Sequence, residues 1–121
     1  MINKKTLVIG GSTNSHRFSY KAIRKLRSYG YEVVSIGGRE GMVDNVQIIK
    51  GKAEFESIHT ITMYIGARHQ PPMYEYILGL KPKRIIFNPG TENQELEKLA
   101  VEKGIEIVIS CTLVMLNEGM Y

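Results

Sequence analysis

The chain has 121 residues, of which 43% are hydrophobic and 23% charged. This length suits one domain around one core, so we expect residues 1–121 to form a single domain and exclude a two-domain enzyme. The formal charge of +4 attracts anions in general, and it does not separate nucleic acid from an anionic cofactor.

The pattern of apolar residues predicts neither a membrane-spanning helix nor a signal peptide. No apolar run approaches the roughly 20 residues that a spanning helix needs, and the start of the chain lacks the long apolar region of a signal peptide. The one cysteine, Cys111, excludes an internal disulfide and a cysteine-based metal cluster. We therefore expect a cytoplasmic protein without a membrane partner.

The predicted elements repeat one unit, in which a helical pattern stops at Gly or Pro and a β-branched run follows. Strands are predicted at 5–10, 32–37, 59–65, 84–87 and 106–109, with an optional one at 46–49. Helices are predicted at 18–29, 72–80 and 93–103. Such alternation builds an α/β fold of three layers, with a mainly parallel five-stranded sheet between helices.

Finer features of these elements can be predicted as well. In the first helix the buried stripe should consist of Ala22, Ile23, Leu26 and Tyr29, which lie at helical spacing. Thr91 and Gln94 have the spacing of a capping box for the last helix. The glycine-rich segment 37–52 is expected to loop over the carboxyl edge of the sheet.

The stretch 8–19 carries the clearest functional signal. A predicted strand ends at Gly10-Gly11 and leads into a helix, where glycines allow close backbone approach and helix amides point at an anion. Additional donors suited to phosphate are the hydroxyls of Ser12, Ser15 and Ser19 and the guanidinium of Arg17. The alternative is a plain connection whose serines only cap the helix.

The tip of the second strand bears on which nucleotide binds. A dehydrogenase that uses NAD places an acidic residue there, to hold the ribose hydroxyls. This chain has Gly37-Gly38-Arg39-Glu40 instead. Arg39 suits a ribose phosphate, which favours coenzyme A (CoA) or NADP over NAD; a solvated loop charge is the alternative.

Over residues 6–116 the chain resembles the small stand-alone CoA-binding domain proteins, which are related to the nucleotide-binding domain of succinyl-CoA synthetase. The resemblance rests on Gly10-Gly11-Ser12 with Arg17 and Ser19, on the stretch Asn88–Glu95, and on Cys111 just past the last strand. It implies a Rossmann-like fold with the CoA diphosphate near Ser12, Arg17 and Ser19. It further implies that Gly66, Arg68, Pro89 and Gly90 line the rest of the crevice. One departure is Gly37-Gly38, where many members carry Asn-Pro.

Two further candidate ligand-binding positions lie at the predicted carboxyl edge of the sheet. Asn88-Pro89-Gly90 comes at the carboxyl end of a predicted strand, where open α/β sheets bind ligands. The alternative is that this sequence is only a turn before a helix. Cys111 comes at the same edge and could meet the thiol end of CoA in a mixed disulfide. A buried, inert cysteine is the alternative.

These features favour a non-catalytic module that binds CoA or acyl-CoA as a sensor, carrier or accessory subunit. No catalytic set and no metal site can be assembled from the scattered histidines and glutamates. Two alternatives remain open: an NADP-dependent small reductase or partner subunit of an acyl-CoA ligase, and a nucleotide-responsive regulator that binds protein or nucleic acid. A homodimer or a protein partner also stays open, whereas nucleic acid is disfavoured by the absence of a reading motif.

Overall fold

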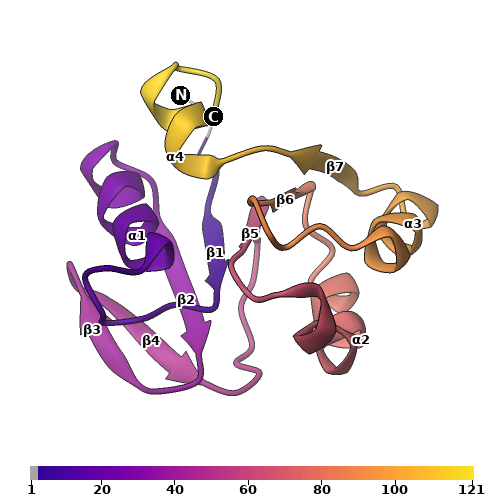
Figure 1. The fold of residues 1–121 in the computed structure, drawn as a ribbon, viewed down its shortest axis with the longest axis horizontal. Coiled ribbons are helices and arrows are strands. Elements are labelled where there is room, and N and C mark those ends of the chain that lie inside the picture. The colour runs from indigo at the N-terminus through magenta and orange to yellow at the C-terminus, as the bar shows by residue number, and fades with distance from the viewer. Residues whose placement is uncertain (1–2) are drawn as a thin grey trace.

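The computed structural model describes residues 3–121. Within them a single sheet has the strand order β3-β4-β2-β1-β5-β6-β7, and only the β3–β4 pair is antiparallel (Figure 1). The strands are β1 Thr6–Ile9, β2 Val33–Gly37, β3 Gly41–Val43, β4 Val46–Lys50, β5 Thr60–Met63, β6 Arg84–Phe87 and β7 Glu106–Ile109. The reversal of strand order beside β1 brings the loops after β1, β2 and β5 together at the carboxyl edge.

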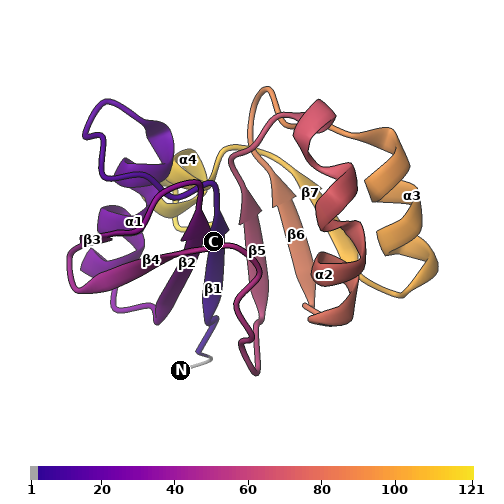
Figure 2. The same ribbon diagram turned by 90° about the horizontal axis from the view of Figure 1, so that it is seen from below.

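Helices cover both faces of the sheet, which confirms the predicted three-layer α/β architecture. They are α1 Phe18–Ser28, α2 Tyr74–Gly79, α3 Gln94–Glu102 and α4 Thr112–Asn117, and the 3₁₀ turns η1 Ala67–His69 and η2 Pro71–Met73 precede α2. Helices α2 and α3 lie on one face, and α1 and α4 on the other (Figure 2). No helix among residues 3–121 is long and apolar enough to cross a membrane.

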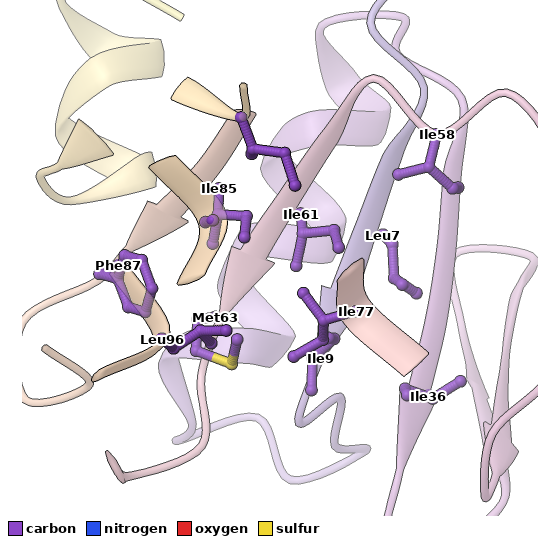
Figure 3. Close-up of a cluster of buried hydrophobic side chains, with 12 residues drawn as sticks. Leu7, Ile9, Ile36, Ile58, Ile61, Met63, Ile77, Ile85, Phe87 and Leu96 are labelled. Carbon is purple, nitrogen blue, oxygen red and sulfur yellow. The ribbon is translucent and has the colours of Figure 1, made fainter. Parts of the chain in front are cut away.

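The core consists of two apolar layers, one on each face of the sheet. Alternation along β1 sends Leu7 and Ile9 to the layer beneath α2 and α3 (Figure 3) and sends Val8 to the layer beneath α1 and α4. Because both faces are covered, the central strands are buried along their whole length. This explains why they appear in the sequence as short runs composed mainly of apolar and β-branched residues.

The sheet has seven strands and not the expected five. The optional strand predicted at 46–49 is confirmed as β4, whereas the rest of segment 37–52 is not a loop over the sheet edge. The segment forms the β3–β4 hairpin, and β4 adds to the sheet beside β2. The turn is Asp44-Asn45, and both residues have positive φ, 47° and 65°. Two successive left-handed residues form the tight hairpin turn whose twist matches that of the strands.

Two details at the helices also differ from expectation. Tyr29 is 48% exposed, and Ser19 takes its place in the buried stripe of α1. Helix α3 is capped by Asn93, whose side chain accepts from the amides of Glu95 and Leu96, and not by a Thr91–Gln94 box. The hydroxyl of Thr91 instead donates to the backbone of Asn88.

The sequence did not predict helix α4. It packs beside α1 and buries Met115 and Leu116. The final residue, Tyr121, is 7% exposed; its hydroxyl is hydrogen-bonded to Thr6, and its ring centroid lies 4.5 Å from the Arg84 guanidinium. Tyr121 is therefore part of the core.

Candidate functional site

Close backbone packing fixes the loop after β1. A Cβ on Gly11 would lie 2.1 Å from the Ser35 hydroxyl, and a Cβ on Gly37 would lie 2.4 Å from the Gly11 carbonyl oxygen. Gly10 has a φ of +94°, which L side chains rarely adopt. These three glycines let the loop after β1 cross directly over the end of β2.

The amides of Gly10 and Gly11 are not available to a ligand, contrary to the usual picture of a glycine-rich loop. Both donate to the carbonyl of Ile36, at 2.9 Å each. Asn14 shapes the rest of the loop, because its amide donates to the Ser12 hydroxyl while its side-chain oxygen accepts from the amide of His16. The loop is thus held by its own hydrogen bonds, and its anion-binding capacity must lie elsewhere.

That capacity lies at the start of α1. Within residues 3–121 no side chain caps this helix, and its first turn carries no acidic residue. The amides of Phe18 and Ser19 have no acceptor within the helix, as at any helix start. An anion next to this turn would meet free N–H groups and the positive end of the helix dipole.

A cleft of about 670 Å³ lies against this helix start. Seven of the residues predicted from the sequence line it: Gly10, Gly11, Ser12, Arg17, Ser19, Arg39 and Pro89. We call this space the polar cleft. Within residues 3–121 neither Arg17 nor Arg39 makes a salt bridge, and both are exposed. Two guanidinium groups are therefore free to bind an anion.

The β3–β4 hairpin supports the polar cleft from outside. A Cβ on Gly41, the first residue of β3, would lie 2.4 Å from the Thr13 methyl group. Thr13 and its neighbour Asn14 also line the cleft. Strand β3, which the sequence did not predict, thus packs directly against the loop after β1.

A smaller apolar hollow of about 230 Å³ adjoins the polar cleft and shares Gly10 and Gly38 with it. Its walls are Ile9, Ile36, Gly37, Ile65 and Met73, with Gly51 and Lys52 completing the lining. Gly37, predicted as a site residue, is found here. The hollow is apolar and lies at the point where the strand order reverses, a position where open α/β sheets bind ligands.

On the other side of the polar cleft lies a chamber of about 150 Å³, which we call the cysteine chamber. It is lined by Phe18, Tyr64, Asn88, Pro89, Cys111 and Leu113. Cys111 is partly exposed here. The structure thus brings the predicted Asn88, Pro89 and Cys111 together, beside the polar cleft.

Asn88 has a structural task that the sequence could not show. It is 2% exposed; its side-chain amide donates to the Thr62 hydroxyl and the Met63 carbonyl, and its oxygen accepts from the amide of Thr112 at 2.9 Å. All three partners belong to the protein. Asn88 therefore ties β5 and β6 to the start of α4, whereas its neighbour Pro89 is exposed.

Four predicted residues lie outside these cavities. Ser15 faces a shallow depression on the outer side of α1 that includes Lys21, Arg24 and Asp44. Gly66 precedes η1, and the Arg68 Nε lies 3.2 Å from His69 Nε2. Gly90 adopts a φ of +90° and donates its amide to the Glu92 carboxylate. Its positive φ explains the glycine without a ligand.

Tyr64 is the main site residue that the sequence did not identify, together with Phe18 and Thr91. It directly follows β5 and lines both the polar cleft and the cysteine chamber. Its hydroxyl is buried and has no hydrogen-bond partner within residues 3–121. Burial, followed by the nearby Cys111, raises the pKa of Tyr64 well above its usual value, so the hydroxyl stays protonated. Its position at the carboxyl end of a predicted strand was the available signal.

Gln70 joins two of the loops that surround the site. It is fully buried, and its side-chain amide donates to the carbonyls of Ile65 and Thr91, at 3.0 and 2.8 Å. Its oxygen accepts from the side-chain amide of Asn93 at 2.8 Å. The loops after β5 and β6 are therefore held together before any ligand binds. Among residues 3–121 no group of acidic, histidine or cysteine side chains is arranged to hold a metal ion.

Comparison with known proteins identifies relatives of this fold. A crystal structure of an uncharacterized protein is 46% identical, covers 100% of both chains and has a TM-score of 0.96. A hypothetical protein from Pyrococcus horikoshii OT3 is 20% identical over 98% of this chain and 84% of its own, with a TM-score of 0.85. A protein from Thermus thermophilus is 18% identical over 98% and 91%, with a TM-score of 0.86. The last two share the fold, and no curated protein matches the chain.

The family model described as CoA binding domain matches residues 4–117. The match spans the loop after β1, the hairpin, both loops held by Gln70 and the residue Cys111. It therefore covers the sheet and all three cavities at its carboxyl edge. On this match, the chain belongs to the family of CoA-binding domains.

Proposed function

We propose that this chain binds CoA or acyl-CoA at the carboxyl edge of its sheet and acts as a non-catalytic sensor, carrier or accessory module. The observation that carries the proposal is the uncapped start of α1 next to two arginines without salt bridges, Arg17 and Arg39, in the polar cleft. The diphosphate of CoA is the anion that this arrangement suits.

The start of α3 provides an internal contrast. Its first-turn amides are taken by the Asn93 side chain, and the amide of Asn93 donates to the Glu97 carboxylate. Glu95 and Glu97 place negative charge in the same turn. Helix α3 is thus satisfied by its own residues and repels anions, whereas α1 is left open, which supports α1 as the phosphate site.

The neighbouring cavities suit the rest of the nucleotide. The apolar hollow accepts the adenine ring beside Ile36, and Arg39 binds the ribose phosphate from the loop after β2. In this arrangement the diphosphate lies between the two arginines. The pantetheine arm then leads away from β2, toward β5 and β6.

A binding role without catalysis fits the carboxylates near the site. The Glu92 carboxylate accepts from the Gly90 amide, and the Glu95 carboxylate accepts from the Tyr74 hydroxyl at 2.9 Å. Both therefore have structural partners, as expected of residues around a helix start. Their positions are thus explained without a catalytic role.

Ligand binding is best tested by thermal unfolding of the reduced protein with CoA, dephospho-CoA, NADP and NAD at equal concentrations. A ligand at 100 times its Kd adds about 2.7 kcal/mol of stability. We expect a rise in Tm with CoA and a smaller one with dephospho-CoA, which lacks the ribose phosphate. A rise with NADP but none with CoA would favour the reductase alternative, and no rise with any of the four would reject the proposal.

A further inference from the structure

The polar cleft and the apolar hollow differ in charge from two other basic cavities of the protein. The polar cleft contains Arg17 and Arg39, the hollow contains Lys52, and no acidic residue of the described chain lines either space. By contrast, the cavity at the amino edge of the sheet has three lysines together with Glu75, and the depression beside α1 includes Asp44. At the carboxyl edge, cations are therefore gathered without a carboxylate to neutralise them.

Lys52 comes to this edge from β4, the strand beside β2 (Figure 1). Strands β2 and β4 are parallel, and their last residues, Gly37 and Lys50, are register partners. Arg39 and Lys52 each follow two residues later, after neighbouring strand ends that lie about 4.8 Å apart. The fold thus brings one cation from each strand to the same part of the edge.

Within residues 3–121, Lys52 is the one charged residue in the wall of the hollow. The rest of the wall consists of glycines and of four apolar residues, Ile9, Ile36, Ile65 and Met73. Lys52 is exposed and, in the described part of the chain, makes no salt bridge. An apolar hollow with a free ammonium group suits a ligand that joins an apolar ring to an anion.

Three cations follow one another along the edge in the order of the strands. Lys52 comes after β4, Arg39 after β2 and Arg17 after β1, and these strands are neighbours in the sheet. Arg17 directly precedes α1, at the helix start that is proposed to bind the diphosphate. Lys52 is at the other end of this row, on the far side of Arg39. A nucleotide that carries a second phosphate on its ribose matches the arrangement.

We propose that Lys52 is a specificity-determining residue, which binds the ribose phosphate of CoA together with Arg39. The inference rests on the proposed CoA binding and adds a second cation, supplied by β4, to the same site. A phosphate monoester carries close to two negative charges at neutral pH, whereas one guanidinium group carries a single positive charge. Two cations match the phosphate and favour CoA over dephospho-CoA, in which a neutral hydroxyl takes its place.

The direct test compares Lys52→Gln with the wild type by calorimetry, with CoA and with dephospho-CoA. Because Lys52 is exposed, the substitution should leave the Tm of the free protein nearly unchanged. We expect the affinity for CoA to fall about three- to tenfold, the loss of one charge-assisted contact at an exposed site. The affinity for dephospho-CoA should stay within about twofold. Equal weakening of both ligands, or of neither, would overturn the inference.

Lys50→Gln is the matched control. Lys50 is also exposed and also belongs to β4, but it lines neither cavity. Its substitution removes the same charge two residues away and should leave both affinities within about twofold. Lys52→Arg keeps the charge and should keep the preference for CoA. If Lys50→Gln weakened CoA binding as much as Lys52→Gln does, the net charge of the edge would explain the effect, and the role of Lys52 would be wrong.

Two further measurements locate the contact on the ribose phosphate. Lys52→Gln should bind adenosine 3′,5′-bisphosphate more weakly than the wild type does, whereas AMP, which has no phosphate at the 3′ position, should bind both equally. Combined with Arg39→Ala, Lys52→Gln should give a non-additive loss of CoA affinity, because both side chains contact one phosphate. Strictly additive losses would place the two cations on different groups of the ligand and contradict the inference.

The same measurements separate this inference from the proposed function. If the wild type binds neither CoA nor dephospho-CoA, the proposed function fails. If the wild type binds both ligands and Lys52→Gln changes neither affinity, the CoA site stands and only the role of Lys52 fails.

Discussion

The Ser35 hydroxyl fills the space beside the Cα of Gly11, where a Cβ would lie 2.1 Å from its oxygen. The same hydroxyl donates to the Val8 carbonyl at 2.9 Å. This contact joins β1 to β2 directly beneath the polar cleft. It makes Gly11 a steric requirement of the site, although its amide does not face the ligand.

Gly11→Ala should therefore destabilise the protein by about 1–3 kcal/mol, the usual cost of overpacking, and weaken CoA binding. Adding Ser35→Ala should restore much of the lost stability, because the next atom that the new methyl group meets is the Ser35 Cβ at 3.3 Å. Urea unfolding of both single variants and the double variant measures the coupling. Strictly additive losses would contradict the steric explanation.

The two arginines of the polar cleft should have separable effects on affinity. Arg17→Ala should weaken CoA and dephospho-CoA alike, by about 10- to 100-fold, as expected for hydrogen bonds to a charged group. Arg39→Ala should weaken CoA alone, because only CoA carries the ribose phosphate. Calorimetry with both ligands measures each effect.

Arg24→Ala is the matched control, since it removes the same charge from the same helix outside the cleft. Arg24 is exposed and paired with Asp44 at 3.3 Å. Its loss should leave CoA affinity nearly unchanged. If all three variants weakened CoA equally, net charge rather than the cleft would explain binding.

Asn88→Ala should act on stability more than on ligand contact. It removes three buried hydrogen bonds and leaves the Met63 carbonyl and the Thr112 amide without that partner. We expect a loss of about 2–4 kcal/mol in urea unfolding. The exposed neighbour Pro89→Ala serves as control and should stay within about 0.5 kcal/mol of wild type. Unchanged stability of Asn88→Ala with lost CoA binding would instead make Asn88 a ligand residue.

Much of the fold could be predicted because its central strands are buried on both faces. Such strands appear as short apolar runs between helical patterns, and the bounds of β6 and β7 agree with the prediction. Of the β3–β4 hairpin, β4 was predicted as the optional strand 46–49, whereas β3 was missed because the glycines around it suggested a loop. The informative feature was Asp44-Asn45, a pair that tolerates the left-handed turn.

The location of the site was predictable, but the direction of its side chains was not. Sequence places Asn88 and Pro89 at the same strand end, yet only the structure shows that the Asn88 side chain is buried and hydrogen-bonded within the protein, whereas Pro89 is exposed. The same limit applies to Ser15, which lies on the outer side of α1. Tyr64 was overlooked because a tyrosine after a strand is usually a core residue, and its unpaired hydroxyl is visible only in three dimensions.

His59 should make stability depend on pH. Burial, followed by the positive charges of Arg84, Lys4 and Lys83, lowers the pKa of His59 from its usual 6.5. Its Nδ1 lies 2.8 Å from the Thr60 hydroxyl, whose oxygen already accepts from Arg84 Nε. Thr60 can donate its proton to Nδ1 of a neutral imidazole, whereas a protonated Nδ1 would have to donate to an oxygen that already accepts from Arg84.

The unfolded chain takes up this proton at a higher pH than the folded protein does. The contribution of His59 to stability is thus fully present above the unfolded pKa of 6.5 and falls as the pH drops from there toward the lower folded pKa. Urea unfolding of the wild type between about pH 5 and 8 should show this decline. His59→Gln, which can still accept from Thr60, should flatten that part of the profile, whereas the exposed His69→Gln should retain it. An unchanged profile in His59→Gln would assign the pH dependence to another group.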